Sequence, residues 1–307
     1  MGELMSGQNR PSSCADEGLV VVTPKRQIPT VRLRRLAAEL RRLRNGSELT
    51  REDVTNRTGI NEATLYRIET ARVRPQRRTL VALLDLYEVR DPHRGEVLAL
   101  LQGANKQGWL RPYHSELPEE YTAYISFESE AWEVRNYESL FVPGLLQTED
   151  YARAVIRGTL PMATAEAVEQ RVQARVERKY VLTKDDPLRL WAITDEAALR
   201  RLVGGRKVMR EQLEHLARVI QEPHVTLQAI PFSAGAHAGM PGSFVLMGFA
   251  DAEDPEIVYL DSMAGDLFLE AEIDVRRYGV MFDNLRAQAL SPDGTLSLIT
   301  ELIGDML

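Results

Sequence analysis

Hydrophobic residues recur at helical spacing through the first third of the chain. Between Thr30 and Arg44 they fall every three or four positions, which predicts an amphipathic helix. The same spacing predicts further helices over Thr79–Tyr87 and around residues 97–101. Between these segments, Val54 belongs to a short helix that begins after Thr50, and a second short helix follows with two apolar residues three positions apart, Leu65 and Ile68.

The two short helices are separated by residues suited to a tight turn. Thr50 is a good N-cap for the first helix, and acidic residues in its first turn suit the helix dipole. Gly59 adopts a positive φ without steric cost, and Asn61 is a strong N-cap for the second helix. The pattern indicates a helix-turn-helix, the motif whose second helix enters the major groove of DNA. A purely structural helical hairpin is the alternative.

After residue 130 the pattern becomes a mixture of alternating and helical stretches. It predicts an α+β domain with a small, mainly antiparallel sheet that includes strands over 188–194, 225–230, 243–249 and 257–261. We therefore divide the chain into a disordered tail, an all-α five-helix domain, a linker rich in acidic residues and tyrosine, and the α+β domain: residues 1–27, 28–111, 112–130 and 131–307.

Charge supports this division. The net charge of the whole chain is −7, which by itself argues against DNA binding. Residues 25–111, however, hold 19 Lys and Arg against 10 Asp and Glu, whereas residues 112–307 hold 18 against 32. The helix-turn-helix thus lies in a segment of charge +9, beside an acidic domain of charge −14. This asymmetry is expected of a DNA reader with a separate sensing or interaction domain.

The spacing of Thr50, Gly59, Leu65, Ile68-Glu69 and Pro75 resembles the Xre or lambda-repressor-like superfamily. In such a domain, residues at the front of the second helix would read base edges; here they are Asn61, Glu62, Ala63, Thr64 and Arg67. Residues flanking the motif would contact backbone phosphates; here they are Thr50, Arg51, Tyr66, Arg72, Arg74, Arg77 and Arg78. For Tyr66 the edge of the core is an equal alternative.

The resemblance further implies a structural ion pair between Arg44 and Glu69. The sequence departs from the common pattern of the superfamily at two positions. Thr55 stands where alanine is usual, and Ala71 stands where glycine is usual. Both departures bear on how the helices pack and leave the motif itself intact.

Four later segments resemble the C-terminal domain of an actinobacterial family of Xre-type regulators, described as toxin–antitoxin-like or WhiJ-like. They are YESLFVPGLLQTEDYARAVI (137–156), WAITDEAALRRLVGG (191–205), PFSAGAHAG (231–239) and VYLDS (258–262). The resemblance implies a small partner protein encoded nearby. It implies no site residues in the domain.

The α+β domain carries little sign of catalysis. Ser233, His237, Asp195 and Glu196 suggest a hydrolase triad, but the G-x-S-x-G turn of such enzymes is absent. The five histidines lack the spacing of a metal site, and no nucleotide-binding motif occurs, so we expect no metal, cofactor or catalytic residues. Our candidates for a ligand or partner contact are residues in and after the glycine-rich loop: Phe232, His237 and Phe244.

The favoured hypothesis is a cytoplasmic, sequence-specific transcription regulator that binds double-stranded DNA as a homodimer and senses a small-molecule effector or a small protein. The nucleoid would be its location when bound to DNA. An antitoxin-like protein, for which DNA binding is only autoregulation, is the alternative, and an enzyme tethered to DNA is a third reading. Cys14 is the sole cysteine, no apolar run is long enough to span a membrane, and no signal peptide is expected.

Overall fold

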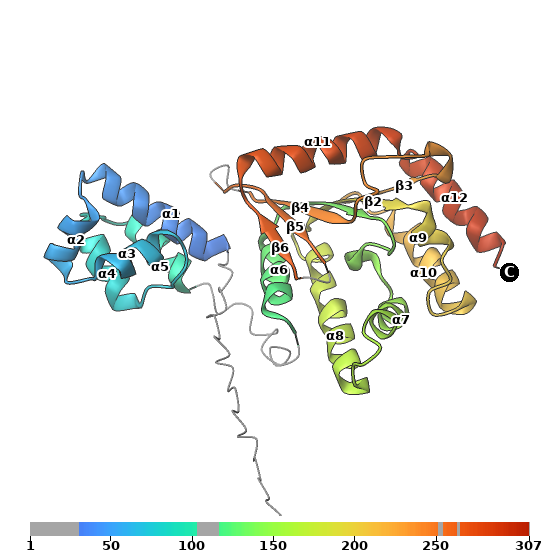
Figure 1. Cartoon of the computed structure of the whole chain (residues 1–307), viewed down its shortest axis with the longest axis horizontal. Coiled ribbons are helices and arrows are strands. Elements are labelled where there is room, and N and C mark those ends of the chain that lie inside the picture. The colour runs from blue at the N-terminus through green and yellow to red at the C-terminus, as the bar shows by residue number, and fades with distance from the viewer. Residues whose placement is uncertain (1–30, 103–116, 251–253, 263–264, 307) are drawn as a thin grey trace, which may run out of the picture.

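The computed structural model describes residues 31–102, 117–250, 254–262 and 265–306. The tail expected over residues 1–27 lies outside these ranges. Two bodies lie side by side, a helical one and a larger one built on a sheet (Figure 1). No helix in the described ranges is long and apolar enough to cross a membrane.

Residues 31–102 form the expected all-α domain of five helices: α1 (Val31–Gly46), α2 (Arg51–Thr58), α3 (Glu62–Glu69), α4 (Arg77–Leu86) and α5 (His93–Gln102). Their apolar faces meet in one core, to which every helix contributes: Leu36 and Leu40, Val54, Leu65 and Ile68, Leu80, Leu83 and Leu84, and Val97 and Leu101. Each of these short helices is marginal alone in water, so burial of this shared core stabilises them.

Residues 117–306 form an α+β domain, as expected. Within the described ranges its sheet has six strands in the order β3-β2-β1-β4-β5-β6. They are β1 (Glu133–Glu138), β2 (Arg189–Asp195), β3 (Val225–Ile230), β4 (Phe244–Gly248), β5 (Ile257–Leu260) and β6 (Leu267–Leu269). Strands β1, β2 and β3 pair in parallel, and the pairs β1–β4, β4–β5 and β5–β6 are antiparallel. The strands β1 and β6 were not among those predicted.

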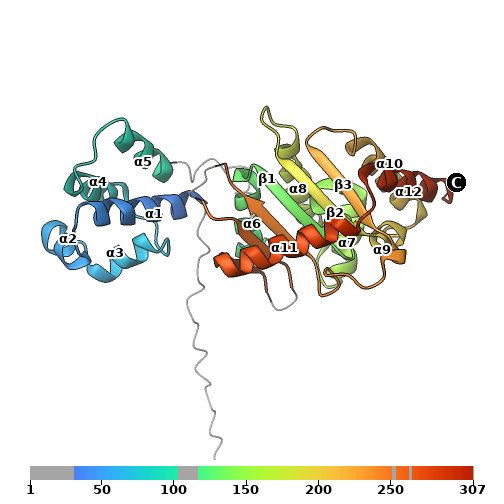
Figure 2. The ribbon, with the colours of Figure 1, turned by 90° about the horizontal axis from the view of Figure 1, so that it is seen from above.

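Helices cover both faces of the sheet. One long helix, α11 (Glu272–Gln288), runs along one face, and most of the others lie on the opposite side (Figures 1 and 2). The remaining helices are α6 (Glu119–Glu130), η3 (Gly144–Leu146), α7 (Glu149–Thr159), α8 (Ala165–Glu177), η4 (Arg178–Leu182), α9 (Glu196–Arg200), α10 (Arg206–Val219), η5 (Phe232–Ala234) and α12 (Pro292–Gly304).

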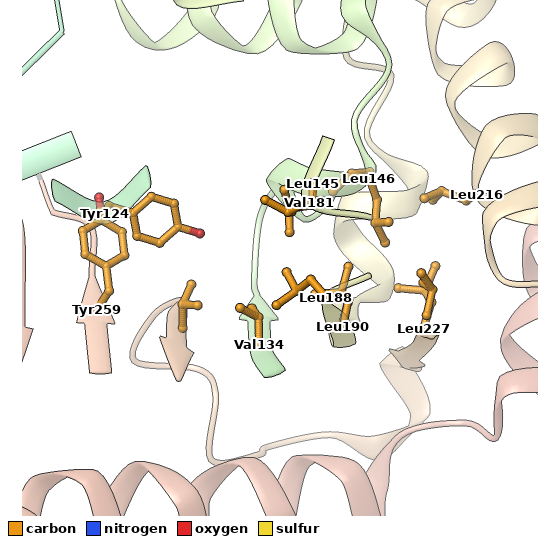
Figure 3. Packing of buried hydrophobic residues seen from close by; sticks show 14 of the residues in the cluster. Tyr124, Val134, Leu145, Leu146, Val181, Leu188, Leu190, Leu216, Leu227 and Tyr259 are labelled. Carbon is orange, nitrogen blue, oxygen red and sulfur yellow. The ribbon is translucent and has the colours of Figure 1, made fainter. Parts of the chain in front are cut away.

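The main core of this domain lies between the sheet and the helices opposite α11. Figure 3 shows aliphatic side chains on the sheet side facing those of η3, η4 and α10, with the tilted ring pair of Tyr124 and Tyr259 at one end. A second core, beneath α11, includes Phe282 and Leu285 of that helix and Phe244 of β4.

The prediction of a linker over residues 112–130 is wrong for its second half. Residues 119–130 form α6, and Leu117, Tyr124, Ile125 and Phe127 are buried in the main core. Glu128 of this helix is 1% exposed, and Arg178 of η4, 2.8 Å from its carboxylate, compensates the buried charge. A pairing with a residue 50 positions away cannot be read from local composition.

Candidate nucleic-acid interface

Local hydrogen bonds position the helix-turn-helix as the sequence predicts. The Thr50 side chain accepts from the Asp53 amide at 3.1 Å, and the Asp53 carboxylate accepts in turn from the Thr50 amide at 2.9 Å, which completes a capping box. Gly59 closes α2 with φ of 71°, and the Asn61 side chain caps α3 by accepting from the Ala63 amide at 2.9 Å. These contacts set the angle between α2 and α3.

The front of α3 faces solvent. Asn61, Glu62, Ala63 and Arg67 are exposed and Thr64 is partly exposed, so all five base-reading candidates lie on one accessible surface. Arg67 folds back on the helix, donating from Nε to the Ala63 carbonyl at 3.2 Å and from an NH2 group to the Thr64 hydroxyl at 3.3 Å. Both are weak contacts that a guanine edge can replace.

Glu69 is buried behind this surface, with 0% of its side chain exposed. The ion pair expected with Arg44 is present, at 2.6 Å from Arg44 Nε to Glu69 Oε1. Arg51 Nε donates to the other carboxylate oxygen at 2.8 Å, a partner that the sequence did not indicate. One carboxylate therefore ties the end of α1 and the start of α2 to the end of α3.

The residues predicted to contact phosphates differ in whether another group of the protein already binds their side chains. Arg72, Arg77 and Arg78 are exposed. Arg77 and Arg78 open α4, whose first turn has no acidic residue. Two cations at a helix N-terminus are unfavourable by themselves, and a bound phosphate would compensate both their charge and the helix dipole. Arg74 and Thr50 are exposed as well, but Arg74 donates to the carbonyl of Leu101, and the Thr50 hydroxyl donates to the Asp53 carboxylate at 2.6 Å.

Tyr66 is 40% exposed on α3 and projects beside the arginines rather than into the core. The guanidinium carbon of Arg51 lies 5.2 Å from the centroid of the Tyr66 ring, and that of Arg72 lies 5.5 Å from it. Of the two alternatives for Tyr66, its position favours the phosphate side.

The three candidates in the α+β domain do not share one accessible surface. Phe232 is 58% exposed, whereas Phe244 is 2% exposed in the core beneath α11. The His237 side chain is 6% exposed; its Nε2 lies 3.3 Å from Asp195 Oδ2, and its Nδ1 accepts from the Gly239 amide at 3.3 Å. His237 thus fastens the glycine-rich loop to the end of β2.

Sequence reasoning missed the polar groups at the carboxyl end of β1. The Tyr137 hydroxyl is buried without a hydrogen-bond partner. Burial raises the pKa of the neighbouring Glu138 to about 7, and hydrogen bonds from Ser243 and Asn136 oppose that rise. The apolar residues of β1, Val134 and Tyr137, are three positions apart, so the segment lacks the alternation that indicates a strand.

Comparison with known protein families accounts for both bodies. A family model described as a helix-turn-helix domain matches residues 35–97. A second, described as Domain of unknown function (DUF5753), matches residues 121–301, more than half of the chain. The chain belongs to the DUF5753 family. No curated protein and no solved structure matches it.

The two matches agree with the observed fold of this DUF5753 chain. The DUF5753 region begins inside α6, which places that helix in the second domain and not in a linker. The helix-turn-helix region covers most of α1–α5, including the exposed surface of α3. The DUF5753 chain is thus a DNA-binding regulator of the helix-turn-helix type.

Proposed function

We propose that the chain is a sequence-specific transcription regulator of the Xre type, with α3 reading bases in the major groove. The observation that carries this proposal is the cluster of five solvent-accessible candidates at the front of α3, four of them exposed and one partly exposed. Arginines border it at the start of α2, after α3 and at the start of α4. Arg67 would pair with guanine, Glu62 with cytosine and Ala63 with a thymine methyl group, while the arginines bind phosphates.

The regulator would act as a homodimer on a two-fold site in cytoplasmic DNA, associating with the nucleoid. Dimers of this motif place their two recognition helices about one helical turn of DNA apart, which predicts half-sites with that spacing. The acidic charge of the second domain repels the duplex, so the basic first domain makes the contact with DNA.

The DUF5753 domain would sense a small molecule or a small protein and change DNA occupancy by favouring one of two states. Phe232 and Met240, 58% and 66% exposed on the loop that His237 fastens, support a protein contact at that loop. They also favour the second candidate function, an antitoxin-like protein of the WhiJ-like type that neutralises a small partner. Co-purification of a stoichiometric small protein whose toxicity the chain suppresses would favour this second function.

We propose no catalytic role for the domain. The suspected base, His237, has one ring nitrogen facing Asp195 and the other occupied by the Gly239 amide. Neither nitrogen is free to activate Ser233, as a hydrolase would require. Turnover in a broad hydrolase screen that disappears with His237→Ala would contradict this proposal.

The deciding experiment is selection of binding sites from random duplex DNA at fixed salt with wild type, Arg67→Ala and Arg72→Ala. We expect a palindromic consensus for wild type. Arg67→Ala should lose about 5- to 150-fold of discrimination at one position of each half-site, as expected for one bidentate base contact. Arg72→Ala should weaken binding to all duplexes alike. Equal losses on all sequences for both variants would contradict the assigned roles.

A further inference from the structure

Two arginine side chains lie beside the ring of Tyr66, although their positive charges repel each other in the free protein. The guanidinium carbons of Arg51 and Arg72 lie 5.2 Å and 5.5 Å from the centroid of the Tyr66 ring. Both distances are within the range of cation–π attraction, which an aromatic face offers to each cation. The two arginines nevertheless repel one another, so the arrangement is most favourable when an anion joins it.

Arg51 is held from its other side by the buried carboxylate of Glu69. Its Nε donates to Glu69 Oε2 at 2.8 Å, and 32% of its side chain is exposed. Arg44, only 12% exposed, donates to both carboxylate oxygens, at 2.6 Å to Oε1 and at 3.3 Å to Oε2. Arg44 already compensates the charge of Glu69, so the charge of Arg51 is in excess. This makes Arg44 structural and leaves Arg51 available to a ligand.

Arg72 reaches the same ring from the chain that follows α3. Its amide donates to the Arg67 carbonyl at 2.7 Å, and the preceding Ala71 turns the backbone with φ of 54°. Arg72 is exposed, and no carboxylate in the described ranges lies within ion-pair distance of it. One ring therefore orients an arginine from α2 and an arginine from beyond α3.

We propose that Tyr66 is a positioning residue that holds Arg51 and Arg72 together around one phosphate of the DNA backbone, through its ring and not through its hydroxyl. This rests on the proposed function, DNA binding by α2 and α3. A guanidinium offers paired donors to phosphate oxygens, and an arginine that is already ordered loses less rotamer freedom on binding. Tyr66 thus contributes affinity without reading sequence.

The test uses the full chain with Tyr66→Phe, Tyr66→Leu and Tyr66→Ala. Binding is measured on the selected operator duplex and on an unrelated duplex of the same length, over a range of NaCl concentrations. Tyr66→Phe keeps the ring and should stay within about twofold of wild type. The Leu and Ala variants lack the ring and should bind both duplexes about tenfold more weakly. For these two variants the slope of log K against log salt concentration should be shallower by about 0.9, the value for one phosphate contact.

Three outcomes would overturn the proposal. Tyr66→Phe as weak as Tyr66→Ala would assign the contact to the hydroxyl. Loss on the operator alone would make Tyr66 a base reader. Unchanged binding by Tyr66→Ala would leave the residue without a role. Because Tyr66 is exposed, the variants should keep the wild-type thermal midpoint, and Tyr66→Leu keeps the bulk of the side chain as a second check on folding.

A double-mutant cycle with Arg72→Ala tests the coupling directly. If Tyr66 holds Arg72, removing Arg72 from the Tyr66→Ala protein should cost less than about twofold, although it costs several-fold in wild type. Fully additive losses would contradict the positioning role. Wild type that binds no duplex even at low salt would instead refute the proposed function itself, which separates that failure from failure of the Tyr66 proposal.

Discussion

Single residues of this chain show how strongly a buried charge depends on its partners. Glu69 and Glu128 are both about 1% exposed, and each faces at least one arginine from another helix. A buried carboxylate without such a partner would be costly to ionise. Glu138 is the contrasting case, because its hydrogen-bond partners are the neutral groups of Ser243 and Asn136.

Glu138 should therefore make stability depend on pH. Burial raises its pKa in the folded chain to about 7, Asp261 adds to that rise, and Arg175 opposes it. In the unfolded chain the pKa is about 4.3. The folded state thus holds the proton more tightly, so the contribution of Glu138 to stability is largest below about pH 4 and falls as pH rises to about 7.

We expect Glu138→Gln to remove this dependence. Between pH 5 and pH 8 the unfolding free energy of wild type should fall, relative to that of the variant, by on the order of 1–3 kcal/mol. This difference is smaller than for a fully buried group because the Glu138 side chain is partly exposed. Urea denaturation of both proteins at the two pH values measures the difference. Glu133→Gln, at the start of the same strand, controls for the loss of a charge from β1. A constant difference would contradict the raised pKa.

At the scale of elements, helix ends are defined by local geometry. Thr50, Gly59 and Asn61 each have the side chain or the positive φ that their cap position requires. Three other positions with positive φ in the described ranges, Glu48, Ala71 and Glu88, carry a Cβ that makes this conformation unfavourable. Ala71 precedes Arg72, and its positive φ lies at the turn after which Arg72 reaches the Tyr66 ring.

Glu88 allows the cost of a positive φ to be measured at a position where substitution does not disturb the core. It is exposed just after the end of α4 with φ of 55°. Glu88→Gly should stabilise the N-terminal domain by about 0.5–1 kcal/mol, because glycine adopts this conformation freely. Glu88→Ala keeps the Cβ and should change stability little. Calorimetry of the full chain measures both, and equal effects of the two variants would show that charge, not backbone strain, is responsible.

At the scale of the whole molecule, the first turns of α1 connect the two domains. Arg34 forms an ion pair with Glu270 at the end of β6, and its guanidinium lies 5.0 Å from the centroid of the Phe127 ring. Arg35 forms an ion pair with Asp254. Only 13% of the Arg34 side chain is exposed, and this burial lowers its pKa to about 10. Because α1 is also a core helix of the first domain, the contact orients that domain.

Reversing the charge of Asp254 should loosen this contact. In Asp254→Arg, repulsion from Arg34 and Arg35 replaces attraction, and the double variant Arg35→Asp with Asp254→Arg should restore it with a coupling of about 1 kcal/mol. Small-angle scattering should show a larger radius of gyration for the single variant and the wild-type value for the double. Glu211→Arg, on α10, is the control. An unchanged radius for all three would mean that these ion pairs do not hold the domains together.

The sequence by itself determined the helix-turn-helix, its caps and its exposed residues, because each depends on neighbours within four positions and on a period of 3.6. Resemblance to a known superfamily supplied the pair of Arg44 and Glu69. Only the tertiary structure decided the rest. Parallel pairing of β1 with β2 joins residues 56 positions apart, and the ion pair of Glu128 in α6 with Arg178 joins residues 50 positions apart. The contact of Arg51 and Arg72 with one ring, that of Tyr66, is likewise visible only in the folded chain. Local pattern carries no information about such distant partners, because the free energy of those contacts arises only when the whole core has formed.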